Sequence, residues 1–294
     1  MSRQPLTAAE VCFVRDFPLG SAPISMQTPI LMVHGMCCTG EVWSQFRSFF
    51  EARGAKVYTP TLRAAERVSI FSKPPRSLGQ LSLHDYVSEL EREVERIEHE
   101  TGRTPAVIGH SMGGLLAQAL AERNKVVAAV LISPAAPGGV KTLPTHLFWG
   151  TFGLLHRFGL TPPVIRPHPR TVFPMVLHAM PKAARQAVAD NMVWESGRVF
   201  AEFAHFPIDE SKIRVPVLTV AATRDRLVAA SLVRRTGKKY ASVGGDFREY
   251  KSHAHWLYAE PGWEQPAQEI YAWLERAAER SSVGVQSLQP VASA

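Results

Sequence analysis

Short apolar runs alternate along the chain with longer segments in which apolar residues recur every three or four positions. The runs that predict β-strands lie at residues 11–14, 30–33, 56–58, 106–108, 126–132, 215–221 and around 247–250. Between them, residues 83–98 predict an amphipathic helix, and residues 112–123 predict an apolar helix that is largely buried. Strands that alternate with helices in this way predict an α/β fold, with a mostly parallel, doubly wound sheet covered by helices on both faces.

The pattern changes between residues 139 and 210, where aromatic, proline-rich and helix-like segments follow one another without a clear strand. About 70 residues between two strands are too many for an ordinary crossover connection. We therefore expect an α/β core from residues 1–138 and 211–280, with residues 139–210 inserted between two late strands as a mostly helical cap. From residue 281 the chain is small and polar, which predicts a disordered tail over residues 281–294.

The sequence AVIGHSMGG holds the most specific chemical signal in the chain. An apolar strand leads into Gly109-His110-Ser111-Met112-Gly113, and a helical pattern follows directly. This is the G-x-S-x-G pattern in the context of a nucleophile elbow, a strained turn that lifts a serine hydroxyl clear of the sheet. Glycine suits both flanking positions because a larger side chain would collide with the neighbouring backbone. We therefore predict that Ser111 is a nucleophile; an incidental serine in a tight turn is the alternative.

A serine that attacks a carbonyl needs hydrogen-bond donors for the oxyanion, and two backbone N–H groups usually supply them. Met112, directly after the serine, provides one candidate, and Met36, in the loop after an earlier strand, provides the other. His34 begins the same loop and is expected to structure it rather than to take part in catalysis. Cys37 and Cys38 follow with nothing nearby to activate a thiolate, so we expect them to be packing or pocket residues.

Serine is a weak nucleophile at neutral pH and needs a general base that an acid holds in place. The strand at 215–221 ends in a loop at Asp225, on the same sheet edge as the serine turn, whereas the strand at 126–132 has no carboxylate at its end. Asp225 is thus the predicted acid, with a helix cap or a solvated aspartate as the alternative. The base must follow the acid in the chain order of such sites, and the candidates there are His253 and His255.

Composition narrows the partners and the compartment. The chain has 294 residues, with 33 Lys and Arg against 26 Asp and Glu, which gives a net charge of +7. The basic residues are scattered along the chain rather than clustered with aromatic residues among them. A nucleic-acid partner is therefore not expected. The three cysteines cannot all form disulfides with one another. The first residues lack the apolar core of a signal peptide, and no apolar run reaches the roughly 18 residues that a membrane span needs. We expect a reduced, cytoplasmic setting, and the sequence gives no indication of oligomeric state.

These motifs together resemble those of the α/β-hydrolase fold superfamily and, within it, the capped serine hydrolases of the esterase and lipase kind. HGMCCTGEVW, GHSMGG, VLTVAATRD and HAHWLYAEPGW occur in the expected order, and the resemblance covers about residues 12–280. It implies Ser111 as nucleophile, Asp225 as acid, His255 as base, and the N–H groups of Met36 and Met112 as oxyanion hole. The loop RAAERVS departs from the family pattern, since many relatives have a glycine-containing turn such as PGHG there.

Local sequence also favours His255 over His253 as the base. Trp256-Leu257 follows His255 directly and can anchor its loop against the core, whereas His253 lies between two small residues. His253 is therefore expected to be solvated or to stand behind the catalytic groups.

The fold hosts many reactions, so the site must decide among them. Serine at the nucleophile position argues against the dehalogenases and epoxide hydrolases of the superfamily, which resemble this chain but have an aspartate there. We therefore expect a serine hydrolase that cleaves a carboxylic ester or lactone of a small to medium apolar substrate through an acyl-enzyme, with no cofactor. The alternatives are a ligand-binding receptor or scaffold without turnover, and an amidase or C–C hydrolase with the same triad. A metal-dependent lactonase at His253 and His255 is disfavoured, because the sequence after them lacks further ligands.

Apolar residues of the predicted cap suggest an apolar substrate pocket. Trp149 and Phe152 are the substrate-binding candidates. Others of this kind are Phe148, Leu154, Leu155, Val164, Phe173 and Met175. The plainer interpretation is that these side chains form the cap's own core.

Overall fold

A parallel sheet forms the centre of the fold, as the alternating pattern predicts. The computed structural model of the chain describes residues 27–140, 155 and 158–286. In this part of the chain, one sheet has six strands in the order β2-β1-β3-β4-β7-β8, and each strand runs parallel to its neighbours. The strands are β1 (Ile30–Val33), β2 (Val57–Tyr58), β3 (Ala106–His110), β4 (Ala129–Ile132), β7 (Val217–Ala222) and β8 (Asp246–Tyr250). β4 begins later than residue 126, and the strand predicted at 11–14 lies outside the described residues.

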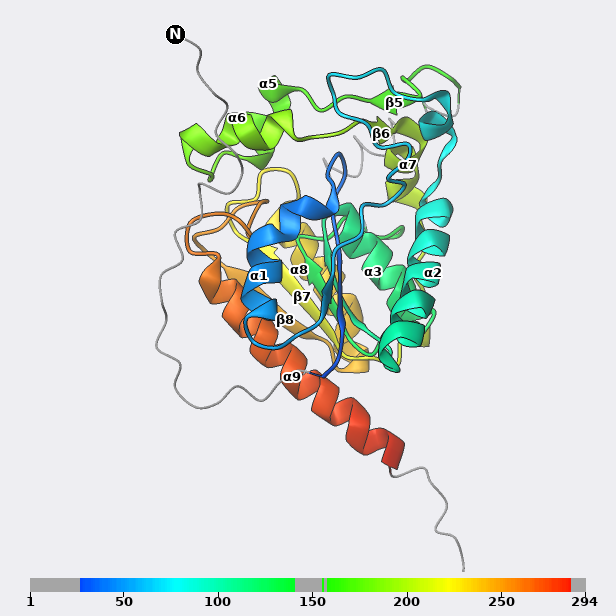
Figure 1. Cartoon of the computed structure of the whole chain (residues 1–294), viewed down its shortest axis with the longest axis vertical. Coiled ribbons are helices and arrows are strands. Elements are labelled where there is room, and N and C mark those ends of the chain that lie inside the picture. The colour runs from blue at the N-terminus through cyan, green and yellow to red at the C-terminus, as the bar shows by residue number, and fades with distance from the viewer. Residues whose placement is uncertain (1–26, 141–154, 156–157, 287–294) are drawn as a thin grey trace, which may run out of the picture.

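Helices cover both faces of the sheet (Figure 1). On one face lie α1 (Ser44–Glu51) and α9 (Glu264–Gln286), and on the other lie α2 (Leu83–Thr101), α3 (Met112–Glu122) and α8 (Ala230–Tyr240). Strand side chains alternate between the two faces. Ile30 and Met32 of β1 join the first core, whereas Leu31 and Val33 join the second. The continuous apolar runs in the sequence therefore reflect burial on both sides of the sheet.

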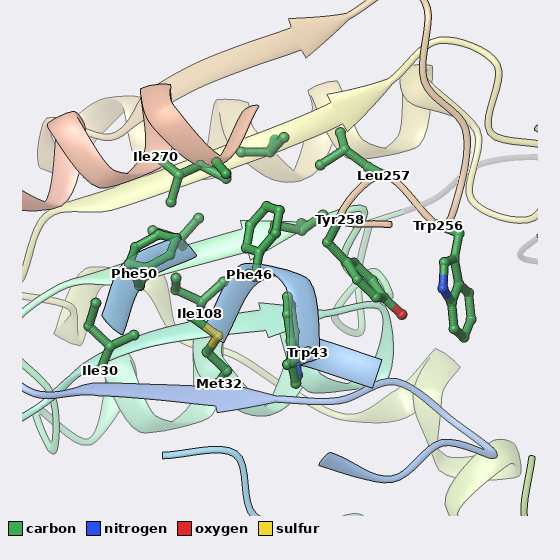
Figure 2. Close-up of a cluster of buried hydrophobic side chains, with 14 of the residues drawn as sticks. Ile30, Met32, Trp43, Phe46, Phe50, Ile108, Trp256, Leu257, Tyr258 and Ile270 are labelled. Carbon is green, nitrogen blue, oxygen red and sulfur yellow. The ribbon is translucent and has the colours of Figure 1, made fainter. Parts of the chain in front are cut away.

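The core beneath α1 and α9 is rich in aromatic side chains (Figure 2). Trp43, Phe46 and Phe50 are fully buried, and the ring centroids of Trp43 and Tyr258 are 4.6 Å apart. Each such side chain removes roughly 150–250 Å² of surface from water. Because Tyr258 belongs to the loop between β8 and α9, these contacts also fix the loop that carries His255.

Local sequence sets the ends of α2. The Ser82 hydroxyl accepts the N–H of Asp85, and the Asp85 carboxylate accepts the N–H of Ser82, which together form a capping box. Gly102, with φ of 69°, ends the helix in the left-handed conformation that glycine favours. The helix buries an apolar stripe that includes Tyr86, as its spacing predicts.

The segment between β4 and β7 lies over one end of the sheet (Figure 1), and we call residues 139–210 the insertion. Its described elements are β5 (Val164–Ile165), α5 (Pro169–Thr171), α6 (Lys182–Asp190), β6 (Glu195–Ser196) and α7 (Gly197–Glu202). Short helical turns occur along the chain at η2 (Gly40–Trp43), η3 (Arg76–Gln80), η4 (Val172–Val176), η5 (Phe203–His205), η6 (Glu210–Lys212) and η7 (Ala241–Val243).

Two sequence predictions for the insertion are wrong. β5 and β6 form an antiparallel pair where no strand is expected, and the helix-like run that follows residue 181 is broken between α6 and α7. The break follows from hydrogen bonds to a distant loop. The N–H of Trp194 donates to the carbonyl of Val68 (3.1 Å), and the N–H of Ile70 donates to the carbonyl of Met192 (3.3 Å). Pairing with another segment thus overrides the local helical pattern.

The last helix is longer than the sequence predicts. α9 continues to Gln286, past residue 281 where a tail is expected to begin, and residues 287–294 lie outside the described residues. Extending a helix that packing has already nucleated costs little, which explains how a small, polar segment can continue it. No helix in the described residues combines the length and the apolar character that a membrane crossing needs.

Candidate active site

Ser111 lies at the sharp turn between β3 and α3. Its φ of 55° and ψ of −116° are sparsely populated by residues other than glycine, and strain of this kind is found mainly at functional sites. A Cβ atom at Gly109 would lie 2.1 Å from the carbonyl oxygen of Gly113, and one at Gly113 would lie 2.1 Å from the carbonyl oxygen of Val33. Both glycines of the G-x-S-x-G pattern are therefore required by close backbone approach. The turn holds the Ser111 side chain in the wall of a cavity.

The structure brings His255 to Asp225. Asp225 follows β7 and His255 follows β8, so both stand at the carboxyl edge of the sheet, where Ser111 also lies. Nδ1 of His255 lies 2.8 Å from Oδ2 of Asp225, and both side chains are almost fully buried. Since a carboxylate only accepts, a neutral His255 carries its proton on Nδ1 and presents Nε2 as a base. His255 and Ser111 line the same cavity.

Asp225 itself is held by backbone groups. Its Oδ1 accepts the N–H groups of Leu227 and Val228, each at 2.8 Å. The carboxylate is therefore oriented with one oxygen on its own loop and the other on His255.

Two further side chains fix the His255 loop, and sequence reasoning missed both of these roles. Nε2 of His110 donates a hydrogen bond to the carbonyl oxygen of His255 (2.8 Å). The buried carboxylate of Glu260 accepts the N–H groups of Ala254 (2.6 Å) and Trp256 (3.0 Å), on either side of His255. Burial raises the pKa of Glu260, although these two hydrogen bonds oppose the rise.

His253 is placed differently from His255. It is buried rather than solvated, which corrects part of the sequence prediction, and it does not line the cavity. Its ring packs edge-on against Tyr250, and Nδ1 lies 3.1 Å from the hydroxyl of Ser252. Burial lowers its pKa, which favours the neutral ring. The pairing with Asp225 thus distinguishes the two histidines where sequence spacing could not.

The loop after β1 runs beside Ser111. A Cβ atom at Gly35 would lie 3.2 Å from the Cβ atom of Ser111, and Met36 lines the cavity. Within the described residues, the N–H of Met36 has no hydrogen-bond partner in the protein. Met112 begins α3, where the first N–H groups of a helix have no partner within the helix. Both N–H groups therefore remain available to a substrate oxygen.

His34 structures this loop, in agreement with the sequence analysis. Its Nδ1–H donates to the carbonyl of Gly35 (2.8 Å), and its Nε2 accepts the N–H of Leu62 (3.0 Å). Burial, aided by the positive charge of Arg67, lowers the pKa of His34 to about 3. The ring is therefore neutral and has both nitrogens bonded.

The cavity at these groups has a volume of about 210 Å³. The core contributes residues that include Gly35, Met36, Cys37, Cys38, His110, Ser111 and His255. The insertion contributes Val140, Ile165, Pro167, Thr171, Val172, Val176, Met192, Phe200 and Phe203. Its described lining contains no Lys, Arg, Asp or Glu. The space suits an uncharged, largely apolar ligand.

Residues 30–273 match the model of the α/β hydrolase family. The chain belongs to the α/β hydrolase family. No curated protein matches the sequence significantly.

Solved structures of low sequence identity share the fold of this α/β hydrolase. They include a monoacylglycerol lipase from Paleococcus ferrophilus (21% identity, TM-score 0.63, covering 85% of this chain and 96% of that one). Methylketone synthase I from tomato has 17% identity and a TM-score of 0.64, with 85% and 98% covered. A methylesterase from Arabidopsis has 15% identity and a TM-score of 0.63, with 86% and 99% covered.

Among its described residues, the insertion of this α/β hydrolase lines the cavity with side chains other than the candidates that its sequence suggests. Trp149 and Phe152 lie outside the described residues, as do Phe148 and Leu154. The other candidates, Leu155, Val164, Phe173 and Met175, are described and do not line the cavity. Phe200 and Phe203, which sequence reasoning missed, do line it, and their spacing of three on a helical turn is the signal that could have found them.

Cys37 and Cys38 are buried pocket residues, as the sequence analysis expects. Burial raises the pKa of Cys37 well above its usual range and that of Cys38 to about 12. Both are therefore thiols at neutral pH and weak nucleophiles. In the described part of this α/β hydrolase, no group of three His, Cys, Asp or Glu side chains is arranged to hold a metal ion.

Proposed function

We propose that this α/β hydrolase is a serine hydrolase that cleaves carboxylic esters, lactones included, of small to medium apolar substrates. The observation that carries the proposal is the convergence of a strained Ser111 and an Asp225-bonded His255 on one apolar cavity. The insertion acts as the cap of this cavity, because it supplies much of the apolar wall opposite the sheet edge.

In the proposed first step, Oγ of Ser111 attacks the ester carbonyl while Nε2 of His255 takes the hydroxyl proton. The oxyanion that forms accepts hydrogen bonds from the N–H groups of Met36 and Met112, and Asp225 stabilises the positive imidazole. The bond to the alcohol oxygen then breaks, His255 returns the proton to that oxygen, and the acyl group remains on Ser111.

In the second step, His255 takes a proton from water, and the hydroxide attacks the acyl-enzyme. Collapse of this second tetrahedral species breaks the bond between the acyl carbon and Oγ of Ser111, His255 returns its proton to Oγ, and the acid is released. With a lactone, the alcohol is part of the same molecule, so one hydroxy acid is the product.

The cavity supports an apolar, uncharged substrate. Its described walls offer no opposite charge to a charged acyl chain, and burying an unpaired charge is costly. The fold relative methylketone synthase I was solved with 2-tridecanone, an uncharged apolar ketone. The proposal itself rests on the cavity of this chain.

Labelling with a fluorophosphonate, combined with hydrolysis of a p-nitrophenyl ester series, tests this function. We expect the wild type to be labelled and to turn over short-chain and medium-chain esters, and we expect Ser111→Ala to do neither while remaining folded. A folded wild type that is neither labelled nor active on esters, lactones and amides would contradict the proposal and favour a ligand-binding role. Turnover of amides alone would place the reaction in the amidase class.

A further inference from the structure

A buried ion pair joins the insertion to the core behind the candidate oxyanion loop. Nη2 of Arg67 lies 2.8 Å from Oε2 of Glu195, and both side chains are completely buried. Arg67 belongs to the loop after β2, which departs from the family pattern and lies beside β5 and β6 (Figure 1). Glu195 belongs to β6 of the insertion. The sequence alone predicts a role for neither residue.

The remaining bonds of Arg67 also reach loops of the core. Its Nε donates to the carbonyl of Leu62 (2.6 Å), and its Nη1 donates to the carbonyl of Cys38 (3.4 Å). The guanidinium thus connects the oxyanion loop, the loop after β2 and the insertion through hydrogen bonds.

Both oxygens of the Glu195 carboxylate accept hydrogen bonds. Besides Arg67, its Oε2 accepts the N–H of Cys37 (3.3 Å), while its Oε1 accepts the hydroxyl of Tyr86 (2.6 Å) and the N–H of Ser196 (2.9 Å). A carboxylate with four donors has one defined orientation, so the acceptor that it offers to Cys37 is fixed.

The backbone of Cys37 needs such support. Its φ of 58° is in the left-handed region, which residues other than glycine occupy only when their surroundings hold them there. The insertion holds both of its polar groups: the N–H is bonded to Glu195, and the carbonyl accepts the N–H of Val193 (3.0 Å).

Met36 lies between two constrained peptides. The Gly35 carbonyl, in the peptide that carries the Met36 N–H, accepts from His34, and the next peptide donates the Cys37 N–H to Glu195. The first peptide is therefore anchored by the core alone, and the second is anchored by the insertion. Without Glu195, the turn at Cys37 is free to relax, and the direction of the Met36 N–H changes with it.

We propose that Glu195, held by Arg67, is a positioning residue that sets the oxyanion hole by fixing the Met36–Cys37 backbone. The inference rests on the proposed function. As a consequence, the oxyanion hole is complete only when the insertion packs against the core. Binding of a substrate in the cavity covered by the insertion is therefore coupled to acyl transfer. Misplacing a reacting group by about 1 Å can cost on the order of 100-fold in rate.

A matched pair of double variants separates positioning from stability. Removing one partner of the ion pair would leave a buried charge, so both variants replace Arg67 by Met. In Arg67→Met/Glu195→Gln the amide oxygen can still accept from Cys37, whereas in Arg67→Met/Glu195→Leu no acceptor remains. The two variants have the same charge and differ at one side chain of similar size. Tyr86→Phe, which removes a different bond to Glu195, controls for loss of a hydrogen bond at this cluster.

The measurements are kcat and KM on one p-nitrophenyl ester, the melting temperature, and the inhibition constants of two ligands with the same acyl chain. A trifluoromethyl ketone forms an oxyanion on Ser111, and the matching secondary alcohol does not. We expect the Leu variant to have a kcat and a trifluoromethyl ketone affinity about tenfold or more below those of the Gln variant, with KM and alcohol affinity within about threefold. Tyr86→Phe is expected to lower kcat by less than the loss of the acceptor does, because Arg67 and the N–H groups of Cys37 and Ser196 still hold the carboxylate.

Equal kcat values and equal inhibitor ratios in the two double variants would overturn the inference. An equal loss of affinity for the trifluoromethyl ketone and for the alcohol, together with a lower melting temperature, would also overturn it, because a purely structural role would give that result. If neither variant folds, amide hydrogen exchange of the wild type decides the matter: the Cys37 N–H should exchange together with the amides of β6, and independent fast exchange would overturn the inference. An inactive, unlabelled wild type would instead refute the proposed function.

Discussion

Replacing Asp225 by Asn is expected to remove most of the activity while the fold remains intact. Oδ1 of Asp225 accepts two backbone N–H groups, from Leu227 and Val228, and Oδ2 accepts from His255. An asparagine keeps the two backbone bonds only if its amide oxygen takes the place of Oδ1. Its NH2 group then faces Nδ1 of His255, which must accept, so the imidazole proton moves to Nε2. In that tautomer His255 cannot take the proton of Ser111.

The size of the loss follows from the opposite amide orientation. Turning the amide round restores the His255 tautomer but leaves the N–H groups of Leu227 and Val228 without acceptors in a buried site. Each unsatisfied group costs about 1–3 kcal/mol, or about 2–6 kcal/mol together. The reactive arrangement is therefore rare, and kcat should fall by between about 30-fold and 10⁴-fold.

The assay compares kcat on a p-nitrophenyl ester with the melting temperature of the same protein. Asp209→Asn is the matched control, because Oδ1 of the exposed Asp209 also accepts an N–H two residues ahead, from Ser211, and Asp209 does not line the cavity. We expect unchanged kcat in the control and a nearly unchanged melting temperature in both variants. A kcat for Asp225→Asn within about threefold of the wild type would refute the assignment of Asp225 and point to another carboxylate.

Three further predictions concern the pocket, the elbow and pH. Phe203→Ala should shift the kcat/KM ratio of long-chain to short-chain esters by about tenfold towards long chains, whereas a uniform loss would show that the ring only supports the insertion. Gly109→Ala should destabilise the fold by about 3 kcal/mol or more through the contact with Gly113, while Gly102→Ala, which meets no atom within 4 Å, should cost about 1–2 kcal/mol; similar denaturant midpoints would contradict this. The folded pKa of His34, about 3, lies below its unfolded value, so the stability it contributes is complete above about pH 6.5 and is lost as the pH falls towards 3. The free energy of unfolding should fall by up to about 1.4 kcal/mol per pH unit more steeply in the wild type than in His34→Asn, and parallel slopes would contradict the argument.

The sequence predicts those parts of the fold that local periodicity determines. The run at β1 is apolar at every position, and the run at β7 is apolar at every position but Thr219, because both faces of the sheet are covered. The repeat in α2 reflects one buried stripe. The proximity of Ser111, Asp225 and His255 can be predicted from the sequence for a similar reason. Each follows the end of a strand, and the ends of parallel strands meet at one edge.

The parts that sequence reasoning missed depend on long-range contacts. Glu195 is followed by polar residues in a helix-like run, and nothing in its neighbourhood indicates that Arg67, far away in the chain, pairs with it. Nothing in the sequence around Glu260 indicates that its carboxylate accepts hydrogen bonds from the His255 loop. Phe173 was wrongly suggested as a pocket residue because composition identifies apolar residues, whereas the packing of the insertion decides that Phe200 and Phe203 line the cavity.

Covalent capture of the acyl group shows whether Ser111 is the nucleophile. The wild type is mixed with a p-nitrophenyl ester, quenched with acid in the first turnovers and digested, and the acylated peptide is identified by mass. We predict one acyl group on Ser111, in amounts that match the burst of p-nitrophenol, and none in Ser111→Ala. Steady turnover without a covalent adduct, or an adduct on Cys37 or Cys38 instead, would contradict it.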